Sequence, residues 1–205
     1  MEKKPDPVYA RNVLEFVAAA NEFCKYAERS SEIKGEELLR ILQRLLPYLY
    51  IRASLLPSLD PVFEDGNEKF VTEEDWNIIH DSLKKQFGNS DKYPDIHDEG
   101  PEGPDVIGQS SISENLADMY QDIKDFLLLY QTGTPEVMND AVWECKMNFE
   151  NIWGQKLVDS LRAIHMFVYP EDEPEGSFEN EKDAERDISE WLISGRRKES
   201  VEDDE

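Results

Sequence analysis

The sequence predicts an all-α protein: a bundle of four to five long helices with a short C-terminal amphipathic helix on an acidic tether. Apolar residues recur every three or four positions over several long stretches, which is the period of one face of an α-helix. Helix-start signals stand before three of these stretches, at Thr72, Ser111 and Thr134. No segment shows the alternation of a half-buried strand. We therefore expect strands to be absent or trivial.

Two helices are expected in the first part of the chain. One runs from about Pro7 to Ala27, because proline suits a first helical turn and the apolar stripe begins soon after it. The second begins near Gly35 and is rich in leucine. Pro47 lies inside it and lacks a backbone donor, so we expect a kink or a split there. The half after this proline, residues 48–56, is apolar on most sides and is predicted to be central.

Three further helices should follow. The first opens at Thr72, after an acidic loop, and ends at Gly88; the next runs from Ser111 to Gly133. The last opens at Pro135 and keeps its apolar stripe to about Val168. Residues 88–109 are rich in glycine, proline and aspartate, so they are expected to form a long connection without regular structure, either functional or disordered.

The chain divides by composition into a bundle domain, residues 1–170, and an acidic tail, residues 171–205. The tail carries 15 acidic and 5 basic residues and few core-forming ones. Within it, residues 181–194 place three apolar side chains on one helical face, and basic residues follow. These tail residues are the predicted partner-binding set: Ile188, Trp191, Leu192, Arg196 and Arg197.

The formal net charge of −24 argues against binding to nucleic acid or to anionic lipid, since both would be repelled. No targeting segment and no apolar run long enough to cross a membrane is evident. Cys24 and Cys145 lack a metal-type spacing and sit on apolar faces, so they are expected to be buried reduced thiols. These observations together predict a cytoplasmic protein with a possible protein partner and no cofactor.

Over residues 8–169 the chain resembles an uncharacterised bacterial family of acidic helical proteins, a domain of unknown function. The resemblance rests on uncommon Trp, Gly-Gln and Pro positions that occur in order in five segments: 45–50, 70–76, 116–126, 143–149 and 153–165. It implies a helical fold. It implies no substrate, cofactor or catalytic residue.

One helix carries a ladder of carboxylates at spacings of four, four and three: Glu114, Asp118, Asp122 and Asp125. Di-metal helical bundles use such groups, but they also take Glu-x-x-His pairs, which this chain lacks. The ladder lies roughly opposite the apolar stripe of its helix, so a solvated face is the favoured interpretation. His80, His97 and His165 are not at metal-ligand spacing, and the acidic loop lacks the pattern of a calcium-binding loop.

Aromatic and polar residues gather on the last two long helices and form the candidate pocket: Tyr120, Trp143, Trp153, Gly154, Gln155 and His165. Buried Trp and Tyr need partners for their polar atoms and often line pockets, although they also pack ordinary cores. Glycine inside a long helix is unfavourable, so Gly154 indicates close approach of another backbone or of a ligand.

No nucleophile or phosphate-binding motif is recognisable in the sequence. The favoured function is therefore a non-enzymatic interaction or regulatory module, with the tail helix as a displaceable lid or as a capture element. The alternative is a metal-dependent enzyme or small-molecule binder that uses carboxylates of the bundle. A third hypothesis is an acidic decoy for a nucleic-acid-binding protein.

Overall fold

The computed structural model describes residues 6–97 and 106–170, with only the backbone described at 95–97 and 106–107. Its α-helices and strands are, in chain order, α1 (Arg11–Glu28), α2 (Gly35–Ser54), α3 (Glu73–Phe87), β1 (Lys92–His97), β2 (Val106–Ser111), α4 (Ile112–Tyr130), α5 (Pro135–Asn148) and α6 (Gly154–Val168). Short 3-10 turns precede α1, α2 and β1, and a π-helical segment, Phe149–Trp153, joins α5 to α6. Helices dominate, so the all-α prediction is confirmed.

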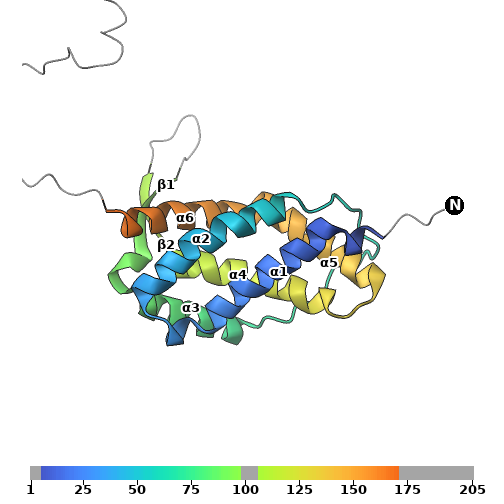
Figure 1. Ribbon diagram of the computed structural model, residues 1–205, viewed down its shortest axis with the longest axis horizontal. Helices are drawn as coiled ribbons and strands as arrows, with labels where there is room; N and C mark the ends of the chain where they lie inside the picture. The colour runs from blue at the N-terminus through green and yellow to red at the C-terminus, as the bar shows by residue number, and fades with distance from the viewer. Residues whose placement is uncertain (1–5, 98–105, 171–205) are drawn as a thin grey trace, which may run out of the picture. The chain divides into compact units, whose positions relative to one another are not determined.

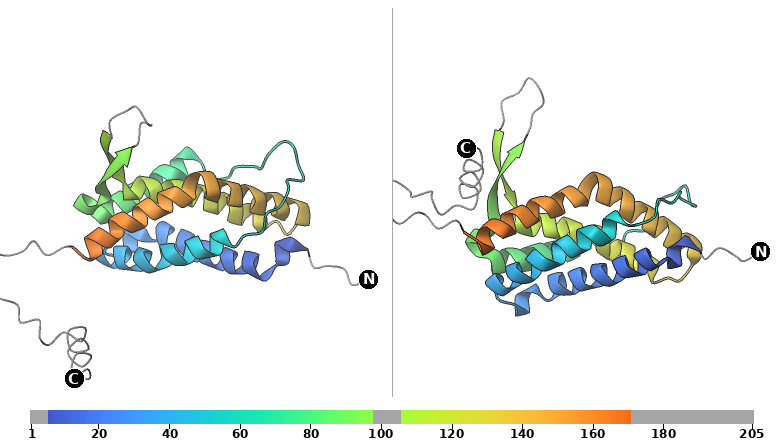
Figure 2. Two further views of the ribbon diagram at one scale, coloured as in Figure 1. Left: turned by 90° about the horizontal axis from the view of Figure 1, so that it is seen from above. Right: turned by 45° about the horizontal axis from the view of Figure 1, so that its top comes forward.

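Four helices enclose the core. α1 packs against α2 and α4, and α6 packs against α2 and α4 (Figures 1 and 2). α3 and α5 add to this arrangement by packing against α4. Fully buried side chains from all four central helices meet between them: Phe16, Leu46, Leu49, Leu116, Ile123 and Leu157. These positions belong to the apolar stripes of the sequence, because the buried face of a helix is the one that repeats every 3.6 residues.

Helix starts coincide with the capping signals. The Thr72 hydroxyl accepts a hydrogen bond from the Asp75 N–H, while the Asp75 carboxylate accepts one from the Thr72 N–H, which completes a capping box. Ser111 caps α4 by accepting from the Glu114 N–H. Thr134 is the residue before α5, as predicted, but its side chain makes no capping hydrogen bond. Local sequence therefore sets these boundaries.

α2 continues unbroken through Pro47, so the predicted split is wrong. The helix is held on its inner side by leucines that are almost fully buried, and this packing outweighs the hydrogen bond that proline cannot donate. The prediction that residues 48–56 are central is also wrong. Ile51 and Leu55 are 54% and 51% exposed, and only one side of this half, including Leu49 and Ala53, enters the core.

Residues 88–109 contain a β-hairpin where an irregular connection was expected. β1 and β2 pair antiparallel, with Lys92 opposite Ser111, and the hairpin projects from the bundle near α6 (Figure 2). Its base is fixed by Asp91, which is 2% exposed and accepts hydrogen bonds from the Ser111 hydroxyl and the Ser113 N–H. Tyr93 is also buried. A two-stranded ribbon with such anchors needs no apolar alternation, which is why the sequence pattern did not reveal it.

The long last helix predicted from the sequence is α5 and α6 joined through a π turn. In that turn the Gly154 N–H donates to the Phe149 carbonyl, five residues earlier. A Cβ at Gly154 would collide with this carbonyl oxygen and approach the Phe149 ring. Glycine is therefore needed by the helix's own π turn. The close backbone approach expected at Gly154 is that of the Phe149 carbonyl, which belongs to the preceding turn of the same helical segment.

Candidate functional site

The carboxylate ladder of α4 was expected to be a solvated face. Glu114 is exposed, as expected. Asp118 is half-buried; it accepts a hydrogen bond of 2.8 Å from the Trp76 indole N–H and forms an ion pair with Lys156. One carboxylate thus joins α4 to both α3 and α6.

The other two carboxylates of the ladder also accept hydrogen bonds from the protein. Asp125 is 2% exposed, and its Oδ1 accepts the backbone N–H groups of Phe70 and Val71, both at 2.9 Å. Asp122 is half-buried and accepts from the Asn148 side-chain amide at 3.0 Å. The solvated-face prediction is therefore wrong for three of the four residues. Their oxygens hold α3, α5, α6 and the segment before α3 against α4.

Burial raises the pKa of Asp122, and the nearby charges of Glu144 and Asp125 raise it further, although Lys69 and Asn148 act in the opposite direction. A carboxyl whose pKa is higher in the folded state loses its proton more readily in the unfolded chain. Ionisation of Asp122 therefore lowers stability above the unfolded value of about 4.

Asp122→Asn is expected to raise the free energy of unfolding at pH 7, because the amide removes the buried charge and can still accept from Asn148. The gain should shrink as the pH falls towards about 4, where the unfolded carboxyl is also protonated. Urea unfolding at several pH values measures it. Glu114→Gln, at the exposed end of the ladder, is the control and should stay within about 0.5 kcal/mol. A loss of stability in Asp122→Asn would contradict this assignment.

The acidic loop between α2 and α3 is anchored by Asp140 of α5. Its two carboxylate oxygens accept the N–H groups of Val62 and Phe63 at 2.7 and 2.8 Å. Burial raises the pKa of Asp140, but hydrogen bonds from the Asn139 amide and from these two N–H groups outweigh it, so the net pKa is lowered. Asp140 therefore contributes stability above its unfolded pKa, and this contribution is lost as the pH falls through the lower folded value.

Metal-ligating groups are dispersed. Among the described residues no three His, Cys, Asp or Glu side chains lie where they could hold one ion. His80 stacks on Trp76 with 4.9 Å between ring centroids, and its Nδ1 lies 2.9 Å from Asp81. His165 is exposed on α6, on another part of the bundle, and the side chain of His97 lies outside the described residues.

The structure does not bring the six candidate pocket residues together. Trp153 is fully buried, with its ring 4.8 Å from that of Phe149, and is part of the core. Tyr120 is 6% exposed and donates to the Glu28 carboxylate; burial and then this negative charge raise the pKa of its hydroxyl.

The remaining candidates lie at the surface. Trp143 is half-buried in a small hollow of about 190 Å³ beside Leu59 and Lys146. Gln155 is exposed and donates to Asp159, four residues on. Gly154 lies in the π turn. Of the six candidates, only His165 lines a larger hollow, which has a volume of about 790 Å³.

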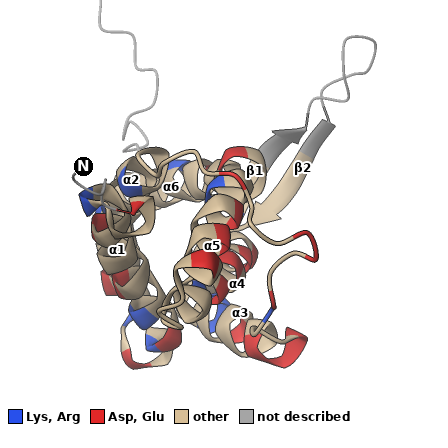
Figure 3. Ribbon diagram, turned by 90° about the vertical axis from the view of Figure 1, so that its right-hand side faces the viewer, with Lys and Arg blue, Asp and Glu red and all other residues tan. Residues whose placement is uncertain are grey.

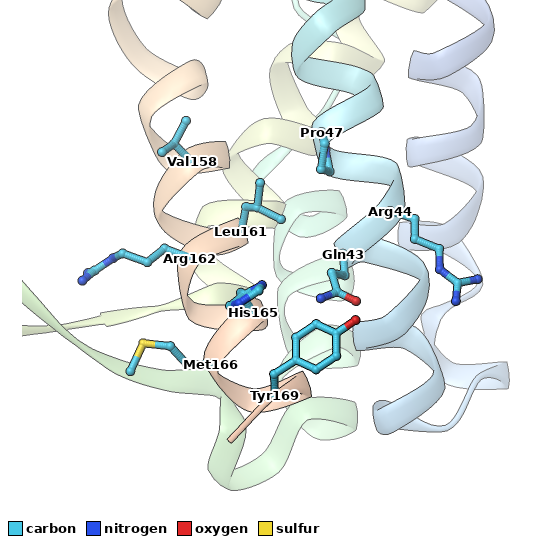
Figure 4. Close-up of a pocket in the computed structure, with 9 residues that line it drawn as sticks. All are labelled: Gln43, Arg44, Pro47, Val158, Leu161, Arg162, His165, Met166 and Tyr169. Carbon is cyan, nitrogen blue, oxygen red and sulfur yellow. The ribbon is translucent and has the colours of Figure 1, made fainter. Parts of the chain in front are cut away.

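That hollow is a surface groove of about 790 Å³ between α2 and α6 (Figure 4). Pro47 of α2 and Leu161 of α6 face each other across it, and Val158 and Tyr169 extend it towards its two ends. Three apolar side chains that line it, Val158, Met166 and Tyr169, are 42%, 55% and 59% exposed. We call this the α2–α6 groove.

Charges around the α2–α6 groove differ from those of the chain as a whole. Its polar lining consists of Gln43, Arg44, Arg162 and His165, and none of the described residues that line it is acidic. Arg44 and Arg162 extend from opposite sides of the groove (Figure 4). Acidic residues are instead prominent on α3, α4 and α5 (Figure 3).

Most of this groove is not evident from the sequence. Helical periodicity marks the narrow stripe of each helix that enters the core, whereas Val158 and Met166 lie beside that stripe on α6. One signal in the sequence could have indicated the groove: the apolar stripe of the last helix is wider than its core-facing side requires. The predicted partner-binding residues of the tail, Ile188, Trp191, Leu192, Arg196 and Arg197, lie outside the described residues.

Cys24 and Cys145 are free and buried, so the prediction of reduced, buried thiols is confirmed. Burial raises the pKa of both thiols, which keeps them protonated and unreactive. None of the helices that the structure describes is both long and apolar enough to span a bilayer.

The fold and its surface define a mainly helical bundle protein whose candidate site is the α2–α6 groove. The chain belongs to the family described as a domain of unknown function (DUF5063), whose model matches residues 7–170. The resemblance to an uncharacterised helical family is thereby confirmed.

A similar solved structure is the crystal structure of protein BF1032 from Bacteroides fragilis, a structural-genomics target. It shares 36% sequence identity with this chain and superposes with a TM-score of 0.72. The match covers 82% of this chain and 98% of that protein. No curated protein matches the chain.

Proposed function

We propose that the protein is a non-enzymatic interaction module that binds an amphipathic helix of a partner protein in the α2–α6 groove. The observation that carries this proposal is the exposure of three apolar side chains, Val158, Met166 and Tyr169, that line one groove. Apolar patches that remain exposed on a folded surface commonly mark interaction sites. Two adjacent helices present a groove into which a third helix can pack.

The dimensions suit a helix. From Val158 to Tyr169 the groove follows about three turns of α6, or roughly 17 Å at 1.5 Å per residue. A partner helix of about eleven residues, with apolar side chains at positions i, i+3, i+4 and i+7, would cover it.

The rival function, a carboxylate-using enzyme or binder, has less support. Asp118, Asp122 and Asp125 each accept at least one hydrogen bond from the protein itself. The six candidate pocket residues are dispersed. We also infer a cytoplasmic location, since two free buried thiols are usual for a protein of a reducing compartment.

Photo-crosslinking in the native host tests this function. A crosslinking amino acid replaces Val158 or Met166 in the full chain, and Ile78, an apolar residue of α3 that is 61% exposed, is the matched control position. We expect positions 158 and 166 to crosslink to one amphipathic segment of another protein, identified by mass spectrometry, and position 78 to miss it. Identical crosslinks at all three positions, or none at 158 and 166, would reject the groove as a docking site.

A further inference from the structure

We infer a second interaction surface on the acidic loop between α2 and α3. There the exposed side chains of Val62 and Phe63 contact apolar side chains of a basic segment of another protein, and the lysines or arginines of that segment face the carboxylates of the loop. This surface is separate from the α2–α6 groove, and the inference does not depend on the function proposed for that groove. We call residues 60–68 the loop tip.

The two apolar side chains of the loop tip are exposed and adjacent in the sequence. Val62 is 53% exposed and Phe63 is 49% exposed. They belong to the connection of residues 55–72, which lies at the end of the bundle opposite the β-hairpin (Figure 2). A connection of this length without regular structure is uncommon and is often functional. Phenylalanine is also enriched where proteins contact one another.

The loop tip is anchored to α5, so its apolar side chains are presented in a defined position. Asp140, which is 2% exposed, accepts the backbone N–H groups of both Val62 and Phe63. The side-chain amide of the preceding residue, Asn139, donates to the Asp60 carbonyl at 2.7 Å. A loop that is ordered before a partner arrives loses less conformational entropy on binding.

The charge around these two apolar side chains is negative. The lysines that belong to the connection or contact it, Lys69 and Lys146, are already paired with Glu144 and Glu150. The loop tip itself contains no basic residue, and Figure 3 shows acidic residues along this connection. Four carboxylates of the tip are exposed, and none of them forms an ion pair within the described ranges: Asp60, Glu64, Asp65 and Glu68.

These charges select the partner. At physiological ionic strength charges interact over about 8 Å, so carboxylates one or two residues from Val62 and Phe63 act on whatever contacts these side chains. Nucleic acid, anionic lipid and acidic peptides would be repelled, whereas lysine and arginine would be attracted. A segment with apolar side chains between basic ones matches both the apolar pair and its surroundings.

Three synthetic ten-residue peptides test the inference against the full-length protein. The first has two leucines flanked by lysines, the second has serine in place of leucine, and the third has glutamate in place of lysine. Fluorescence anisotropy at low salt should show the first binding about fivefold more tightly than the second, because two partly exposed apolar side chains become buried. The third should not bind, and added salt should weaken both lysine peptides.

The apolar contact is tested by Val62→Ser with Phe63→Ser, which should make the two lysine peptides bind equally. Both side chains are exposed, so the variant should remain folded, as circular dichroism can show. Ile78→Ser, at a position of α3 that is 61% exposed, is the control and should leave the fivefold ratio unchanged. A ratio that persists without Val62 and Phe63 overturns the inference.

The charges are tested by Glu64→Gln with Asp65→Asn, which should weaken the binding of both lysine peptides at low salt. Glu37→Gln with Glu114→Gln changes the net charge by the same amount at exposed positions of α2 and α4, and it should have a much smaller effect. If both double variants act alike, net charge governs binding and the loop tip is not the site. Equally tight binding of the glutamate peptide would overturn the basic partner.

Two further variants separate this surface from others. Val158→Ser with Met166→Ser alters the α2–α6 groove and should leave the binding of the lysine peptides unchanged; a loss would assign these peptides to the groove and overturn the inference. Binding that appears only after Arg196, Arg197 and Lys198 are replaced by glutamine would assign the loop tip to this chain's own tail and overturn the separate partner. No binding of the first peptide to any variant rejects the surface and leaves the groove untouched.

Discussion

Leu157→Ala is expected to lower the free energy of unfolding by about 2–5 kcal/mol, because it removes a fully buried side chain from the centre of the bundle. Leu157 belongs to the core cluster to which α1, α2 and α4 also contribute, and a cavity there cannot be filled by movement of one helix alone. Urea denaturation followed by circular dichroism measures the loss.

Val158→Ala is the matched control, one residue further along α6. Its side chain is 42% exposed in the groove, so truncation should change stability by less than about 0.5 kcal/mol. Similar losses for the two variants would mean that α6 is rotated relative to the face described here.

Asp125→Ala is expected to destabilise the protein by about 2–4 kcal/mol, which is large for a single polar residue. Its carboxylate is 2% exposed and accepts two backbone N–H groups, those of Phe70 and Val71. Alanine would leave both donors without a partner, and hydrogen bonds to a charged acceptor contribute about 1.5–3 kcal/mol each. The segment before α3 should also exchange its amide hydrogens faster.

Asp125→Asn separates the hydrogen bonds from the rest of the side chain. The amide oxygen can still accept both N–H groups, so the variant should retain more stability than Asp125→Ala. Hydrogen exchange at Phe70 and Val71, read by NMR, provides the local measurement. If Ala and Asn behave alike and these two amides stay protected, Asp125 does not anchor this segment.

The sequence by itself determined where most helices lie and which faces they bury. Thr72 and Asp75 form a capping box from residues three apart, and the leucine stripe of α2 repeats with the helical period. Cys24 and Cys145 were assigned to buried positions on the same grounds. Such signals are local: each depends on residues within one or two turns, so they are readable in a single chain.

Only the tertiary structure decided what the polar and exposed residues do. Asp125 accepts from Val71, 54 residues earlier, and Asp118 accepts from Trp76, 42 residues earlier. A helical wheel places both aspartates opposite the apolar stripe of α4, and it contains no information on which segment will cover them.

The α2–α6 groove likewise depends on tertiary contacts and not on local sequence. Pro47 and Leu161 are unremarkable in their own helices, and they line one groove because α2 packs beside α6. The π turn that requires Gly154 lies within the last helix predicted from the sequence. The apolar periodicity continues across this single turn, so it does not reveal the turn. Local periodicity therefore fixes the secondary structure, whereas the candidate site depends on contacts between distant segments, which no periodicity records.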